Sequence, residues 1–173
     1  MRARLLGALA FAFGPVWIRW YRRQYRGQME ALTPEEIRTL SAWFDAELLD
    51  RVRVARVDSI DLGPRWILKH FGRSIVFPAG IALGSHVVLT TSRTPREQMS
   101  TLFHELVHVQ QYRSLGMARF CFRYIAGWCR GGWSYLDIPL EEQAFALQGR
   151  FDRGEVFRVK SEVSGRSSAG GSR

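Results

Sequence analysis

The stretch from residue 94 to 116 constrains the fold most, because the sequence there specifies both ends of a helix. In "TPRE", Thr94 is placed as the N-cap, Pro95 as the first helical residue, and Glu97 closes a capping box. The helix is expected to run to about residue 112 or 114 and to end before Gly116. Apolar residues inside the stretch recur at helical spacing and predict a buried face: Met99, Leu102, Phe103, Leu106 and Val107.

This helix carries the sequence HELVH. His104 and His108 are four residues apart, so their Cβ atoms lie about 5–6 Å apart on one helix face and both imidazoles can reach one metal ion. Glu105 is offset around the helix by about 100°, where its carboxylate can act as the general base for a zinc-bound water without binding the metal. The alternative is a pair of histidines that only face the core or solvent.

Two histidines do not complete a zinc site, because catalytic zinc usually has three protein ligands. Pro139 opens a helix, "PLEEQAFALQGRF", that offers Glu141 and Glu142. Glu141 and Ala144 form an E-x-x-A pattern in which the small alanine allows close approach to the HELVH helix, so we expect Glu141 as the third ligand. Glu142 would face away, and the alternative role for both acids is a favourable charge at a helix N-terminus. The remaining histidines are weaker candidates: His70 and His86.

HExxH with a later glutamate in E-x-x-A resembles the gluzincin branch of the zinc metallopeptidases. More narrowly, "VRVARV", "GIALGSHVVLT" and "LFHELVHVQQY" resemble the metallopeptidase domain associated with extracellular contractile injection systems, over roughly residues 45–150. Two positions depart from that pattern, since Ala55 replaces a usual histidine and Leu83 stands where threonine is frequent. The resemblance implies Zn²⁺ and these site residues: the ligands His104, His108 and Glu141, and the base Glu105.

The resemblance also implies how a peptide or protein substrate is held. In zincins the strand before the motif helix is a sheet edge to which an extended peptide adds, and residues 86–90 would be that edge. An oxyanion stabiliser is needed, for which Tyr135 is the first candidate and Tyr124 the second. Gln111 lies seven residues after His104 on the same face, where it would line the cleft or support a ligand.

The remaining patterns predict an α+β fold, a small zincin-like domain with a short, mostly antiparallel sheet packed on the HELVH helix and a later third-ligand helix. A second capping box, Thr33 with Glu36, opens a helix expected to reach about Leu49. Further elements are expected in this order: a half-buried strand at 51–57, short strands within 73–90 that turn at Gly84-Ser85, a helix at 117–126, a glycine-rich loop at 127–133 and a helix from 139 to about 151.

We divide the chain into an apolar and arginine-rich segment at 1–28, a metallopeptidase domain at 29–158 and a disordered tail at 159–173. The formal net charge is +9, but residues 1–26 hold six arginines and no acid, which leaves only +3 (9 minus 6) for the rest. With no nucleic-acid-binding motif, we expect no nucleic-acid partner.

The apolar run of the first segment, about 14 residues, is shorter than the roughly 20 that cross a bilayer. Its aromatic residues are interleaved with arginines and suit a membrane surface: Trp17, Trp20, Tyr21 and Tyr25. We expect a membrane-associated and otherwise cytoplasmic protein. The alternatives are a helix packed on the protein's own core and, without a clear cleavage site, a cleaved signal peptide.

Two further alternatives stay open. The first is functional: a zinc-dependent metallopeptidase, a non-catalytic zinc-stabilised binding or anchoring domain of the same fold, or a membrane-anchored interaction module with no metal. The second concerns Cys121 and Cys129, which lie roughly 12 Å apart on a continuous helix and cannot pair there. A helix break at Gly127 would allow a disulfide.

Overall fold

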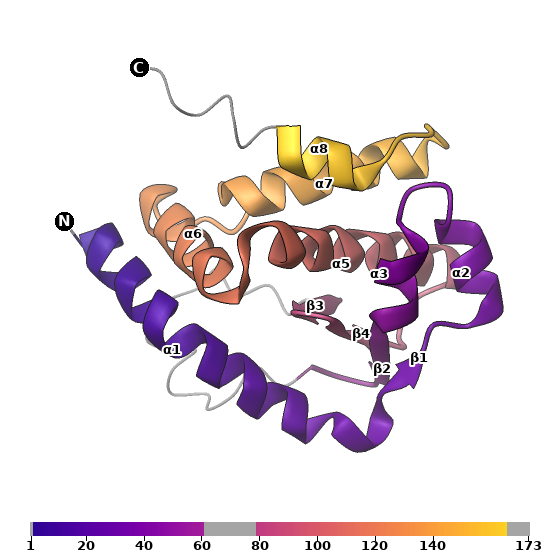
Figure 1. Ribbon diagram of the computed structural model, residues 1–173, viewed down its shortest axis with the longest axis horizontal. Coiled ribbons are helices and arrows are strands. Elements are labelled where there is room, and N and C mark those ends of the chain that lie inside the picture. Colours follow the sequence, from indigo (N-terminus) through magenta and orange to yellow (C-terminus); the bar gives the residue numbers. More distant parts are fainter. Residues whose placement is uncertain (1, 61–78, 166–173) are drawn as a thin grey trace.

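The computed structural model describes residues 2–60 and 79–165. Helix α5 (Pro95–Leu115) lies at the centre of the α+β fold, with a four-stranded sheet on one side and helices α7 (Pro139–Asp152) and α8 (Val159–Gly165) on the other (Figure 1). This position explains why every residue of α5 from Leu102 to Gln111 is buried. The sheet packed on the HELVH helix, and a later helix that carries Glu141, are both as expected.

The predicted ends of α5 are confirmed. The Thr94 hydroxyl accepts a hydrogen bond from the backbone N–H of Glu97, and the Glu97 carboxylate accepts one from the N–H of Thr94. Gly116 ends the helix at φ 76°, a backbone conformation in which a Cβ atom would be strained.

The predicted helix from Pro34 to about Leu49 is wrong. Its capping box forms, but the chain leaves helix α2 (Pro34–Leu40) and starts a second helix, α3 (Ala46–Arg51). The break brings Trp43 and Phe44 onto Phe103, with ring centroids 6.1 and 5.2 Å away. Burial of these rings outweighs the local preference for a continuous helix.

The sheet has the order β1-β2-β4-β3 and is mixed. Strands β1 (Glu30–Ala31) and β3 (Gly80–Leu83) pair antiparallel with their neighbours, whereas the central strands β2 (Arg53–Val57) and β4 (His86–Thr90) pair in parallel. The β3–β4 hairpin turns at Gly84 (φ 74°), as expected. The expectation that residues 86–90 form the sheet edge is wrong, because β2 pairs with the other side of β4. Among the described strands, the edge beside α5 is β3.

Helix α1 (Arg2–Gln24) covers the sheet face opposite α5 (Figure 1). Side chains on β4 alternate between two cores: Val87 and Leu89 pack on the α5 side, while Val88 packs on the α1 side. The α1 side is filled by Ile18 and Tyr21, together with Tyr25 just beyond the helix. A short 3₁₀ turn (Arg26–Gln28) then leads to β1. The alternative that the first segment packs on the protein's own core is therefore confirmed for one side of α1.

Helix α6 (Met117–Arg130) runs through Gly127, so the expected loop at 127–133 begins later than predicted. A Cβ at Gly127 would lie 2.8 Å from Cδ of Pro139, so this glycine allows α6 to approach the start of α7 and does not break the helix. Cys121 and Cys129 lie on this continuous helix and are both free thiols. The disulfide alternative does not occur.

The C-terminal region also differs from the expected disorder at 159–173, because residues 159–165 form α8. Val159 and Val163 are buried in the main core, and the N–H of Val159 donates to the carbonyl of Trp43. The two valines are four residues apart, so they lie on one face of this short helix and turn it toward that core. Within the described ranges, no helix is long and apolar enough to cross a membrane.

Candidate metal centre

Three buried side chains from α5 and α7 meet at one point. Nε2 of His104 lies 3.1 Å from Oε2 of Glu141, and Nε2 of His108 lies 3.3 Å from the same oxygen. The two Nε2 atoms are 3.1 Å apart. The three residues are only 2–5 % exposed, so these donor atoms converge in a largely buried site. The arrangement forms a His-His-Glu group that could hold a metal ion.

The approach of α7 to α5 depends on small and apolar residues on one face of α7. Ala144 is fully buried between the two helices, as its place in the E-x-x-A pattern predicted. Glu141 is therefore carried on the face that meets the histidines, whereas Glu142 is exposed. Pro139 occupies the first turn of α7, where its missing N–H costs nothing.

The orientation of His108 is fixed by a buried glutamine. Nδ1 of His108 lies 2.8 Å from Oε1 of Gln111, whose own Nε2 donates to the carbonyl of Leu140 and to Oε1 of Gln143. Since that amide nitrogen is committed to two acceptors, Oε1 must accept, and Nδ1 of His108 carries the proton. In the neutral ring, Nε2 then presents its lone pair to the point shared with Glu141.

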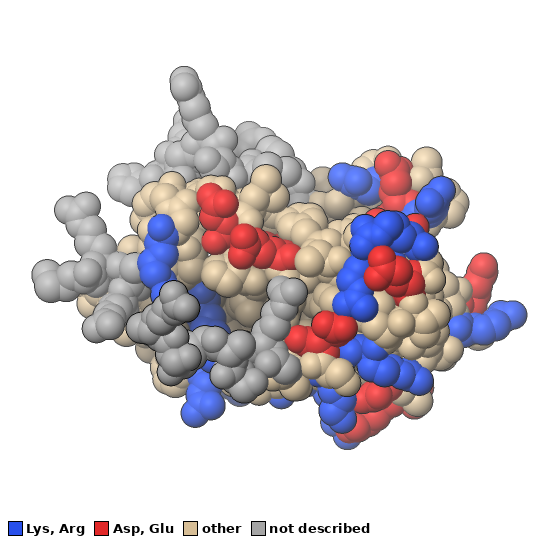
Figure 2. Space-filling model, turned by 90° about the horizontal axis from the view of Figure 1, so that it is seen from above, with Lys and Arg blue, Asp and Glu red and all other residues tan. Residues whose placement is uncertain are grey.

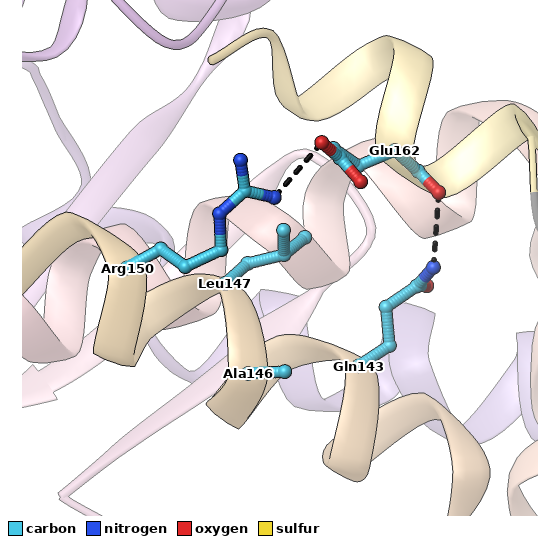
Figure 3. Close-up of a pocket in the computed structure, with 5 residues that line it drawn as sticks. All are labelled: Gln143, Ala146, Leu147, Arg150 and Glu162. Atoms are coloured by element: carbon cyan, nitrogen blue, oxygen red, sulfur yellow. Dashed lines mark hydrogen bonds and ion pairs between the residues drawn. The ribbon is translucent and has the colours of Figure 1, made fainter. Parts of the chain in front are cut away.

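This chain of hydrogen bonds continues to α8. Nε2 of Gln143 donates to the backbone carbonyl of Glu162 at 3.2 Å, across a cavity of about 30 Å³ between α7 and α8 (Figure 3). Arg150 reaches the carboxylate of the same residue at 2.8 Å. The C-terminal helix is thus connected to a histidine of the site through two glutamines.

His104 is held in a similar way from α7. Its Nδ1 lies 3.0 Å from Oε1 of Gln148, and Nε2 of Gln148 donates to the hydroxyl of Ser100. Gln148 follows Glu141 by seven residues, so the two lie on the same face of α7. Both histidines therefore direct Nε2 toward the same point.

The charges at this point are strongly coupled. Burial alone would raise the pKa of Glu141, but the charge of His108 and hydrogen bonds from both histidines hold that pKa well below its usual range. Burial alone would lower the pKa of His108, but the carboxylate of Glu141, then that of Glu105, raise it to about 9. Without a metal ion, these shifts favour an ionised Glu141 beside a positively charged His108, with a proton on both ring nitrogens, at neutral pH.

Glu105 lies beside the three residues, between α5 and β3. Its carboxylate accepts a hydrogen bond from the backbone N–H of Ala82. A Cβ at Gly80 would lie 2.8 Å from both Cγ and Oε1 of Glu105, so glycine at that position leaves room for the carboxylate. Burial raises the pKa of Glu105, partly opposed by the charges of His104 and His108. It is a buried carboxyl group with an increased affinity for a proton.

The two candidate tyrosines lie on the outer side of Glu141. The hydroxyl of Tyr124 donates to Oε1 of Glu141 at 2.7 Å, which leaves Oε2 directed at the histidines. Tyr135 also hydrogen-bonds Glu141, and burial raises the pKa of its phenol, followed by the charges of Glu141 and Glu105. The ring of Phe145, 40 % exposed, lies 4.6 Å from His104 and 6.1 Å from Tyr135.

The structure does not bring His86, one of the two weaker histidine candidates, into this group. His86 is half-buried on β4 beside the Ser85 hydroxyl, and burial followed by the charges of Arg22 and Arg53 lowers its pKa. His70 lies outside the described residues.

Sequence reasoning missed several residues around the site, among them Gly80, Gln143, Phe145 and Gln148. Gln148 had a detectable signal, because it stands seven residues after Glu141. Gly80 and Gln143 had none, since their roles depend on contacts between elements far apart in the chain.

Comparisons of the chain with protein-family models, with curated proteins and with solved structures give no match.

Proposed function

We propose that the protein is a zinc-dependent metallopeptidase whose metal ion is held by His104, His108 and Glu141. The observation that carries this proposal is the separation of the three donor atoms, 3.1–3.3 Å. Zinc bonds of about 2.0–2.1 Å in a tetrahedron place neighbouring donors about 3.3–3.4 Å apart. Two imidazoles and one carboxylate are also a ligand set that catalytic zinc sites use, whereas structural sites are usually closed by four protein ligands.

A zinc ion held there would supply the Lewis acid that acidifies a water molecule and polarises the scissile carbonyl. Glu105 is the residue to take a proton from the attacking water and to deliver one to the leaving amine. Its raised pKa suits both directions of transfer, because a buried carboxylate holds a proton more readily than one in water. The Ala82 N–H keeps the carboxylate beside the site.

Substrate would enter along β3. In the antiparallel β3–β4 pair, alternate residues direct their backbone groups away from β4. At Ala82 these groups are already engaged, because the N–H reaches Glu105 and the carbonyl accepts from the Tyr112 hydroxyl at 3.5 Å. An extended peptide would therefore pair at Gly80, the next such position, and Phe145 with Tyr135 would form an apolar wall beside it. Tyr135 is also the first candidate to stabilise the oxyanion, and Tyr124 is the second.

The test compares cleavage of a broad library of unfolded and peptide substrates by the zinc-loaded protein and by Glu105→Gln. The glutamine keeps the size of the side chain but cannot accept a proton, so we expect normal folding, normal zinc binding and a loss of turnover of at least about 10²-fold. Equal turnover by the variant would contradict the mechanism.

A protein that binds zinc and cleaves nothing in the library would instead be a non-catalytic, zinc-stabilised binding domain. The presence of Glu105 argues against that outcome, because a structural site has no use for a buried carboxyl group beside the metal.

A further inference from the structure

Helix α1 has apolar side chains on two opposite faces, and only one face is used inside the protein. On the inner face, Gly7 and Gly14 bring α1 against α6. A Cβ at Gly7 would lie 3.0 Å from the ring of Phe122, and one at Gly14 would lie 2.6 Å from Sγ of Cys121. Nearer its C-terminal end, α1 buries Ile18 in the core beneath the sheet. This face needs no further partner.

The opposite face carries a stripe of large apolar residues that stays in solvent. Its members are spaced by 4, 4, 3 and 4 residues, so they follow one side of the helix for about 22 Å. They are between 47 and 66 % exposed: Leu5, Leu9, Phe13, Val16 and Trp20. A continuous stripe of this size is unusual on a soluble surface and indicates an interaction site.

Helix α1 and the helix packed against it, α6, carry positive charge. Neither α1 nor α6 contains an acidic residue. Arg22 is engaged by the protein itself, because its Nε donates to the carbonyl of Leu83. Six other arginines of α1, α6 and the adjoining turn are exposed, and no described acid pairs with them: Arg19, Arg23, Arg26, Arg119, Arg123 and Arg130. The face around α7 and α8 differs, since acidic and basic side chains are intermixed there (Figure 2).

We propose that the outer face of α1 binds the surface of an anionic lipid bilayer, with the helix lying in the plane of the membrane. Apolar and aromatic side chains flanked by arginines match the boundary between acyl chains and anionic headgroups. The helix is not apolar enough to cross the bilayer, and its inner face is occupied by α6. This surface is separate from the metal centre. Membrane binding by α1 is therefore expected whether or not the protein is a peptidase.

The test is co-sedimentation of the full chain with vesicles of phosphatidylcholine and phosphatidylglycerol at 3:1, and with pure phosphatidylcholine. We expect binding to the anionic vesicles that weakens as salt is added. Replacing three stripe residues (Leu9→Gln, Phe13→Gln, Val16→Gln) should lower the partition coefficient at least about tenfold. Replacing Arg19 and Arg23 by glutamine should lower it about fivefold for each arginine, the fold-change that corresponds to ~1 kcal/mol.

The controls make the same kinds of substitution, apolar to glutamine and arginine to glutamine, at exposed positions outside α1 and α6. Val156→Gln removes a side chain that is 77 % exposed, and the pair Arg38→Gln and Arg96→Gln removes two exposed charges. Both controls should bind like the unmodified protein. Failure of the full chain to bind anionic vesicles, or unchanged binding by the stripe variant, would overturn the proposal. So would light scattering that shows a dimer which the stripe variant dissociates, since the stripe would then bind a second copy of the chain.

Discussion

Replacement of Gln111 by leucine should weaken zinc binding without touching a metal ligand. Gln111 is fully buried and makes three hydrogen bonds, at 2.8 Å with Nδ1 of His108 and at 3.0 Å to Leu140 and Gln143. Leucine has a similar volume but accepts nothing, so the Nδ1–H of His108 would be left unpaired in a site that water cannot easily reach. Loss of such a partner typically lowers metal affinity 10–100-fold, or about 1.4–2.7 kcal/mol.

The same substitution should also reduce the free energy of unfolding of the metal-free protein. The hydrogen bonds with His108 and Gln143 are lost outright at about 1 kcal/mol each, and the unpaired groups add a penalty of about 1–3 kcal/mol. The Leu140 carbonyl loses less, because it lies in the first turn of α7 and can accept within the helix. We therefore expect a total destabilisation of about 3–5 kcal/mol.

The assay is competition for zinc with a chromophoric chelator, on protein shown by circular dichroism to be folded. Gln110→Leu is the matched control, because Gln110 is also buried but, within the described part of the chain, its side chain hydrogen-bonds only the hydroxyl of Ser114. Gln111→Glu is a second variant that keeps an acceptor for His108 and should retain zinc better than leucine does. Unchanged zinc affinity in a folded Gln111→Leu protein, or equal weakening by Gln110→Leu, would refute the reasoning.

Four further predictions concern the metal centre and helix α1. Glu141→Ala should abolish tight zinc binding while Glu142→Ala leaves it unchanged, as measured by metal content after dialysis; equal retention would mean that Glu141 is not a ligand. The pKa of His108 is raised to about 9 from about 6.5, so protonation of His108 stabilises the fold. This contribution to the free energy of unfolding is complete below about pH 6.5 and is lost as pH rises through 9. The melting temperature of metal-free protein should therefore fall between about pH 6.5 and 9. Zinc affinity should rise across the same window, since the ion displaces a proton from His108, and a flat profile would contradict this coupling. Tyr21→Ala, at a fully buried site between α1 and the sheet, should cost about 3–5 kcal/mol in urea denaturation, whereas a loss below about 1 kcal/mol would mean that α1 is not part of the core.

The sequence predicted the elements whose signals are local. The ends of α5 depend on a capping box and a glycine within a few residues of the helix, and both act as expected. The meeting of Glu141 with the two histidines was likewise predictable, because helical spacing and the small Ala144 determine which faces can approach. Zinc binding and catalysis by these residues stay predictions.

The sequence did not predict features that depend on distant partners. The break between α2 and α3 is stabilised by ring contact with Phe103, some sixty residues later. The docking of α8 includes a backbone hydrogen bond from Val159 to Trp43, more than a hundred residues earlier. The sheet face opposite α5 is covered by one side of α1, while the other side of α1 is exposed. The apolar composition of the first 24 residues could not show which side of the helix would be buried. For the same reason the place of β4 inside the sheet was missed.

The central claim is that α5 and α7 together hold one zinc ion. The most direct measurement is elemental analysis combined with zinc X-ray absorption on the full chain, purified without added metal and then loaded with one equivalent of zinc. We predict one tightly bound zinc per chain, with two imidazole nitrogens and oxygen atoms at about 2.0–2.1 Å. A protein that retains no zinc, or a zinc ion bound through the sulfur of Cys121 or Cys129, would contradict the account.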